Sequence, residues 1–190
     1  TYIRIGSTNR KADITLIHEL QRFALNKYYD EQLFTEMSTE AIDFEAASAS
    51  SKVSSGPQLD GFVALESEVE TRPFLQESRR KGKRIYVPRI DPEKKQMALI
   101  EMMDLKDLKP GPYGILEPPF NEGRAGKPED LDLVVVPGIG FDREGGRLGR
   151  GEGYFDRFLQ ETKRAYKIGL AFRCQVVERI PREANDVVVD

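Results

Sequence analysis

The segment 131–141, LDLVVVPGIGF, is an almost unbroken run of apolar residues, and it constrains the fold more than any other part of the chain. A strand with one face in water alternates apolar and polar residues, whereas a strand buried on both faces is apolar throughout. Strands of the second kind belong mainly to parallel sheets that carry helices on both sides. This segment therefore predicts the central strand of an α/β domain.

Further strands and helices alternate around this segment. The spacing of apolar residues predicts strands at 60–66, 84–90, 96–102 and 167–172, and helices at 70–82 and 154–165. We expect the strand at 84–90 to stop at Pro88, because proline has no backbone N–H to donate. The alternation predicts a three-layer αβα domain around a mostly parallel sheet.

The first 58 residues differ in character from the rest. Residues 1–45 contain a short alternating run and then an apolar stripe at helical spacing over 13–24. Residues 46–58, AASASSKVSSGPQ, are small and polar, which is typical of a flexible junction. We therefore divide the chain into an atypical segment (1–45), a serine-rich junction (46–58) and an α/β domain (59–190).

Composition narrows the classes of partner. The chain has 29 Lys and Arg against 32 Asp and Glu, so it lacks the positive charge typical of nucleic-acid binding. It also has no apolar run long enough to span a membrane. Cys174 is the single cysteine and no signal-like leader opens the chain, so we expect a cytoplasmic protein. For the oligomeric state, we favour a monomer.

A glycine-rich segment separates the apolar strand from the next predicted helix. Residues 141–159 read FDREGGRLGRGEGYFDRFL, with five glycines before the helix. Glycines bring backbone N–H groups close to a ligand, and a helix N-terminus attracts anions. Arg147 and Arg150 add donors for phosphate oxygens, and Asp156 follows in the first helical turn. The pattern favours a phosphate-binding loop over an exposed flexible connection, although it is neither a Walker A loop nor a dinucleotide fingerprint.

The segment 134–159, VVVPGIGFDREGGRLGRGEGYFDRFL, closely resembles the signature of the 5-formyltetrahydrofolate cyclo-ligase family. Further segments of the chain fit the family in order: EVETRPF at 68–74, GKRIYVPRI at 82–90, PGPYGILEPP at 110–119, IGLAFRCQ at 168–175 and NDVVVD at 185–190. The resemblance implies an ATP- and Mg²⁺-dependent reaction in which ATP phosphorylates the formyl oxygen of 5-formyltetrahydrofolate. Attack by N10 and loss of phosphate then leave the 5,10-methenyl product.

The resemblance also implies roles for individual residues. The ATP loop of the family matches Arg147, Leu148, Gly149, Arg150, Gly151, Glu152, Gly153, Tyr154 and Phe155. Its magnesium-associated aspartates match Asp156 and Asp186, and its folate contacts match Leu65 and Glu70. The reaction needs no nucleophilic side chain, so we assign no catalytic residue.

Several of these residues have simpler structural interpretations. Glu70 also fits a charge at a helix N-terminus, and Asp186 also fits a turn after Asn185. Glu117 and Tyr113 belong to a family segment, yet turn formation explains them equally well. The sequence leaves these alternatives open.

Residues 1–45 lack the basic helix with which the family opens. They are similar instead to the end of the AlbA_2 domain of Schlafen-like proteins and transcriptional regulators. An alternative hypothesis is therefore a nucleic-acid-associated regulator fragment fused to an inactive cyclo-ligase-like domain. The two hypotheses differ in what they predict: ATP-dependent formation of the methenyl product, or salt-sensitive DNA binding without turnover.

Overall fold

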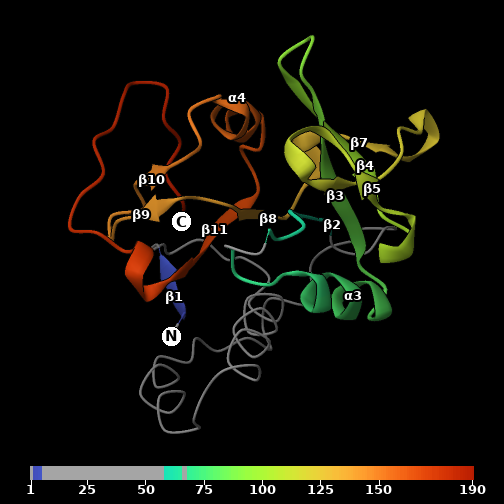
Figure 1. Cartoon of the computed structure of the whole chain (residues 1–190), viewed down its shortest axis with the longest axis horizontal. Coiled ribbons are helices and arrows are strands. Elements are labelled where there is room, and N and C mark those ends of the chain that lie inside the picture. The colour runs from blue at the N-terminus through green and yellow to red at the C-terminus, as the bar shows by residue number, and fades with distance from the viewer. Residues whose placement is uncertain (1, 6–57, 66–67) are drawn as a thin grey trace, which may run out of the picture.

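The computed structural model describes residues 2–5, 58–65 and 68–190 (Figure 1). The helix expected over 13–24, and the serine-rich junction as far as residue 57, lie outside the described residues. None of the described helices has the length and apolar character that crossing a membrane would require.

A seven-stranded sheet with strand order β1-β11-β8-β2-β3-β4-β7 forms the centre of the molecule. Its four inner strands run parallel to one another: β11 (Tyr166–Phe172), β8 (Leu133–Val136), β2 (Gln58–Gly61) and β3 (Arg84–Asp91). The three outer strands are antiparallel to their neighbours: β1 (Tyr2–Ile5), β4 (Gln96–Glu101) and β7 (Ala125–Gly126). The prediction of an α/β domain with a mostly parallel sheet is confirmed in its central strands.

The apolar run is the buried strand that its composition predicts. All four residues of β8 are buried between β11 and β2. Leu133 and Val135 belong to one hydrophobic cluster, and Val134 and Val136 to a second. Because successive strand residues point to opposite faces, β8 contributes to two cores.

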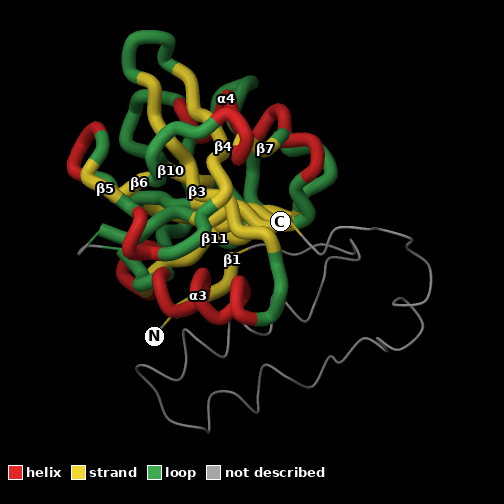
Figure 2. Tube along the Cα trace, turned by 90° about the vertical axis from the view of Figure 1, so that its right-hand side faces the viewer, coloured by secondary structure: helices red, strands yellow, loops and turns green. Residues whose placement is uncertain are grey.

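In the part of the chain that the structure describes, one helix covers each face of the sheet. Helix α3 (Arg72–Arg80) buries Phe74 and Leu75 in the first cluster, and α4 (Tyr154–Glu161) buries Phe158 and Leu159 in the second. Figure 1 shows α3 and α4 on opposite sides of the strands, and Figure 2 shows the same layering from the side. The expected three-layer arrangement is confirmed.

The predicted ends of the strands β2 and β3 are wrong. Strand β2 ends at Gly61 rather than at residue 66, and residues 62–65 lie outside the sheet. Strand β3 continues through Pro88 to Asp91, where we expected it to stop. Its pairing with β2 ends at Tyr86, so beyond that point the described strands pair with β3 only on the β4 side. A proline is tolerated where one edge of a strand makes no ladder hydrogen bonds.

Short elements connect this framework. Two small hairpins pair β9 (Gly140–Phe141) with β10 (Arg147–Leu148) and β5 (Lys109–Pro110) with β6 (Leu116–Glu117). Single 3₁₀ turns occupy η1 (Leu105–Asp107), η2 (Pro112–Gly114), η3 (Glu122–Arg124), η4 (Pro128–Asp130) and η5 (Arg173–Gln175). The β9–β10 hairpin lies between the central strand and α4, so it shapes the glycine-rich segment.

Candidate functional site

A cavity of about 340 Å³ lies at the carboxyl ends of the inner parallel strands. Ligands of open α/β sheets characteristically bind at this edge. One wall is largely apolar and is formed by Phe62, Val63, Leu65, Val87, Pro88, Ile90, Met97 and Ile115. Much of the remaining lining is the glycine-rich segment from Arg147 to Asp156, with Leu148 excepted. The cavity therefore combines an apolar surface with a polar loop.

The five glycines divide into two groups. Gly149, Gly151 and Gly153 line the cavity, whereas Gly145 and Gly146 lie in the turn of the β9–β10 hairpin and do not line it. Gly151 and Gly153 have φ values of 92° and 66°, in the left-handed region that favours glycine. Gly153 directly precedes α4, so it delivers the loop to the N-terminus of that helix.

Arg147 is the most deeply buried charge in the cavity wall, and its side chain is only 4% exposed. One terminal nitrogen, Nη2, donates to Asp156 Oδ1, and the other donates to the carbonyl oxygen of Pro137. Its buried Nε–H has no hydrogen-bond partner among the described residues. Asp156 also lines the cavity. The wall therefore holds a desolvated cation that keeps one unused donor.

Arg150 reaches across the cavity to the segment that follows β2. Its Nη2 lies 3.3 Å from Glu68 Oε1, and Glu68 Oε2 accepts the backbone N–H of Leu65 at 2.9 Å. Arg150 is 57% exposed and Glu68 only 13%. Our sequence reasoning did not select Glu68, although it opens the family-like segment EVETRPF.

Two tyrosines meet at the mouth of the cavity. Tyr113 has a φ of 60° in the turn η2, in agreement with its interpretation as a turn residue, and its side chain also lines the cavity. Partial burial and a hydrogen bond to Tyr113 raise the pKa of Tyr154 above its ordinary value. The Arg157 guanidinium stacks on the Tyr154 ring at 5.3 Å. These contacts join the β5–β6 region to the start of α4.

Some residues that the sequence selected lie outside the cavity lining. Leu148 is half exposed on the hairpin. Glu70 forms an ion pair with Arg72 at 2.8 Å and accepts its backbone N–H, as expected for a charge at the start of a helix. Asp186 accepts the N–H of Glu183 at 2.7 Å, as expected for a turn residue. The structure therefore brings Leu65 and the loop together with Asp156, but not with Asp186.

Glu117 is buried rather than a simple turn residue. It forms an ion pair with Arg89 at 3.1 Å and accepts the N–H of Ile90 at 3.0 Å. Because Ile90 lines the apolar wall, Glu117 fixes the β5–β6 hairpin against that wall.

The carboxylates of the cavity determine whether it could hold the predicted magnesium ion. The described residues contain no cluster of three or more acidic, histidine or cysteine side chains that would hold a metal alone. Mg²⁺ in phosphoryl-transfer sites commonly needs one or two carboxylates and completes its shell with phosphate and water. Asp156, which is 30% exposed at the cavity, fits a Mg²⁺ ion bound in that way.

Comparison with known proteins identifies the family of this chain. The model of the 5-formyltetrahydrofolate cyclo-ligase family matches residues 13–190. The chain is 31% identical to the mouse 5-formyltetrahydrofolate cyclo-ligase in an alignment over 146 residues that covers 68% of this chain and 68% of that protein. It is 33% identical to the Haemophilus influenzae enzyme of the same name over 129 residues, covering 66% of this chain and 69% of that protein.

The chain is also similar to two solved structures. The NMR structure of Aquifex aeolicus 5,10-methenyltetrahydrofolate synthetase superposes with a TM-score of 0.59 at 29% identity, covering 93% of this chain and 86% of that one. The Mycoplasma pneumoniae synthetase shares the fold, with a TM-score of 0.56 at 18% identity and coverage of 95% and 96%. Since the family model spans nearly the whole sequence, this chain belongs to the 5-formyltetrahydrofolate cyclo-ligase family.

Proposed function

We propose that this protein cyclises 5-formyltetrahydrofolate to 5,10-methenyltetrahydrofolate in a reaction that consumes ATP and requires Mg²⁺. The observation that carries the proposal is that one cavity is lined both by an apolar wall and by a glycine loop with two arginines. An apolar wall suits a flat heterocycle, and a loop of this kind suits phosphate. All of the lining residues fall within 59–190, which we propose as the catalytic domain.

In the proposed reaction the γ-phosphoryl group of ATP is transferred to the formyl oxygen, and ADP leaves. N10 then attacks the formyl carbon and loses its proton, and inorganic phosphate departs with the formyl oxygen. A formyl oxygen leaves poorly until it is phosphorylated, so the enzyme mainly positions and neutralises charge.

The residues of the loop supply that neutralisation. Arg147 and Arg150 offer fork-shaped donors to phosphate oxygens, and the start of α4 adds unpaired backbone N–H groups. Asp156 would hold the Mg²⁺ ion, which screens phosphate charge when bound. The desolvated position of Arg147 strengthens its interaction with a phosphoryl group, because low dielectric weakens screening.

The folate would lie against the apolar wall. Leu65, a predicted folate contact, is part of that wall. Glu70 is held close to it, because Arg72 pairs with Glu70 and also donates to the carbonyl oxygen of Ala64 at 3.0 Å. A carboxylate accepts adjacent N–H donors of a pterin together, which supports Glu70 as the second predicted contact.

The proposed function is tested by incubating the purified protein with 5-formyltetrahydrofolate, ATP and MgCl₂. We expect absorbance of the methenyl product to grow, with one ADP formed per product. Omitting ATP or chelating Mg²⁺ should stop the reaction. Absence of turnover together with salt-sensitive DNA binding would favour the regulator hypothesis instead.

Arg150→Ala is expected to weaken ATP binding by about 10- to 150-fold, because a charge-assisted hydrogen bond contributes about 1.5–3 kcal/mol. Arg150 is largely exposed, so we expect the melting temperature to stay nearly constant. Calorimetric titration with a non-hydrolysable ATP analogue measures the effect.

Glu68→Gln is the matched control for Arg150→Ala. It removes the same ion pair but keeps the arginine, so binding of the analogue should be unchanged or tighter. Equal Kd values for Arg150→Ala and the parent protein would exclude a phosphate contact at Arg150.

A further inference from the structure

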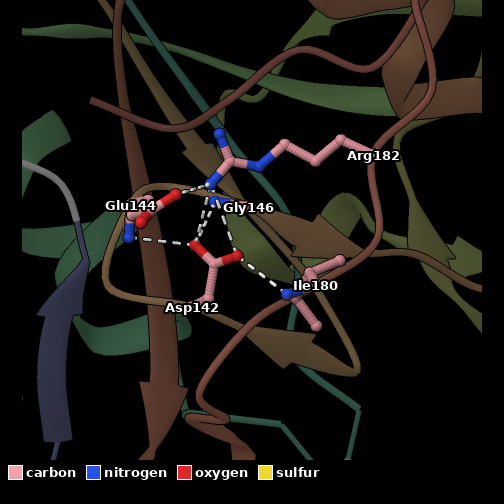
Figure 3. Close-up of polar contacts among 5 residues, drawn as sticks. All are labelled: Asp142, Glu144, Gly146, Ile180 and Arg182. Carbon is pink, nitrogen blue, oxygen red and sulfur yellow. Dashed lines mark hydrogen bonds and ion pairs between the residues drawn. The ribbon is translucent and has the colours of Figure 1, made fainter.

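The Asp142 carboxylate accepts hydrogen bonds from two parts of the chain that are distant in the sequence. It directly follows β9 and is 1% exposed. Its side chain accepts the N–H groups of Gly146 at 2.7 Å, Glu144 at 2.9 Å and Ile180 at 2.8 Å, and the Arg182 guanidinium at 3.2 Å (Figure 3). Ile180 and Arg182 lie 38 and 40 residues further along the chain.

On the loop side, Asp142 closes the turn that delivers Arg147. The backbone N–H of Asp142 donates to the carbonyl oxygen of Gly146 at 2.9 Å. The Gly145 N–H donates in turn to the backbone carbonyl oxygen of Asp142 at 3.2 Å. Arg147 comes directly after this turn and pairs with Phe141 in the hairpin. Any side chain at Gly146 would collide with the Asp142 carboxylate. The direction in which Arg147 enters the cavity therefore depends on this turn.

On the other side, Asp142 anchors the segment 176–190. Val177 donates to the carbonyl oxygen of Phe141 and Val189 to that of Gly145, both at 2.9 Å. Arg182 also lies 3.2 Å from Glu144 at the tip of the turn. The segment thus packs along the hairpin, with the Asp142 carboxylate between them.

The arrangement requires a carboxylate. Oδ1 and Oδ2 both accept N–H groups, from the turn and from Ile180 respectively. An asparagine would place an NH₂ group against one of these donor sets. Burial alone would raise the pKa of Asp142, but the N–H groups of Ile180, Gly146 and Glu144, with Arg182, hold that pKa below its ordinary value.

We propose that Asp142 is a positioning residue that couples the segment 176–190 to the phosphate-binding loop and sets the placement of Arg147. The proposal rests on the proposed function for its effect on ATP. Asp142 does not line the cavity, so it acts on ATP only through the hairpin. Asp142 affects the position of the loop, whereas the residues of the apolar wall belong to other segments of the chain.

The test compares Asp142→Asn with the same change at the exposed Asp107 in η1, under conditions where circular dichroism shows all proteins folded. We expect Asp142→Asn to raise KM for ATP about tenfold or more while KM for 5-formyltetrahydrofolate stays near the parent value. Arg182→Gln removes the ion pairs with Asp142 and Glu144 but leaves the backbone N–H donors to Asp142 in place, so it should shift KM for ATP in the same direction by less. Asp107→Asn should change neither constant. Equal rises in both constants, or an unchanged KM for ATP, would overturn the proposal.

Hydrogen exchange gives a readout independent of turnover. In Asp142→Asn we expect faster amide exchange at 143–153 and at Ile180, with the strands β2 and β8 exchanging as in the parent. Unchanged exchange at 147–153 would overturn the coupling even if the enzyme were active. A parent protein without ATP-dependent turnover would refute the proposed function, while exchange would still decide whether Asp142 holds the loop.

Discussion

We expect Arg147→Ala to lower kcat/KM for ATP by about 10³-fold or more. This is the largest effect that we expect from any single change in the cavity. Arginines that stabilise a transferring phosphoryl group contribute about 10³- to 10⁵-fold to turnover. Arg147 is placed for that task because it is nearly fully buried and its Nε–H has no partner among the described residues. Steady-state kinetics at saturating folate measure the loss.

Two companion variants separate charge from geometry. Arg147→Lys keeps the positive charge but not the planar fork, so we expect it to recover only part of the activity. Asp156→Asn removes the charge that pairs with the buried Arg147, so its activity should fall sharply and its melting temperature should fall as well. Its remaining activity should need more Mg²⁺. An Arg147→Ala enzyme within tenfold of the parent would exclude a direct role in phosphoryl transfer.

The second large effect concerns stability and Asp60. This residue of β2 is completely buried, and neither carboxyl oxygen has a hydrogen-bond partner among the described residues. Its neighbours in register are Tyr86 and Val134. Burial raises the pKa of Asp60 well above its ordinary value, because the sheet interior cannot solvate a charge.

Because the pKa of Asp60 is raised in the folded protein, this residue makes the free energy of unfolding depend on pH. Above the unfolded pKa of about 3.9 the unfolded chain releases the proton of Asp60 while the folded chain keeps it, so rising pH favours unfolding. Between the two pKa values this group costs about 1.4 kcal/mol of stability per pH unit. Asp60→Asn cannot ionise, so it should be increasingly more stable than the parent as pH rises.

Urea unfolding of the parent and Asp60→Asn from pH 5 to pH 8 measures this difference. We expect the gap between their midpoints to widen with pH. Asp142, whose pKa is lowered, acts in the opposite direction: its contribution is lost as pH falls through its folded pKa, below this range. Midpoints that stay parallel from pH 5 to pH 8 would show that Asp60 is ionised in the folded protein.

Local patterns in the sequence predicted much of the fold. Helix α3 occupies 72–80 within the expected 70–82, with Arg79 and Arg80 in its last turn and Gly82 at a φ of 80° just beyond. Helix α4 begins at Tyr154 as expected, but it ends at Glu161 rather than at 165. The buried Lys167 ammonium donates to the carbonyl oxygens of Thr162 and Ala165, which stabilises the chain just past that end. An interaction from the following strand could not be read from the helical pattern.

The site was predictable in part. Arg147, Arg150 and Asp156 were selected because glycines and a helix start stood beside them, and all three line the cavity. Glu68 was missed because its significance depends on Arg150, which is 82 residues away in the sequence. The division of the chain at 46–58, and magnesium binding by Asp186, remain predictions.

By itself the sequence determined the buried central strand, the helices on either side of it and the glycine loop, because burial and backbone freedom leave a local signature in residue type and spacing. Only the tertiary structure decided which distant groups meet. It separated Gly145 and Gly146 from the cavity and placed Glu68 against Arg150. It also brought Ile180 and Arg182 to the Asp142 carboxylate. The physical reason is that periodicity records whether a side chain is buried, whereas its partner depends on how remote segments cross.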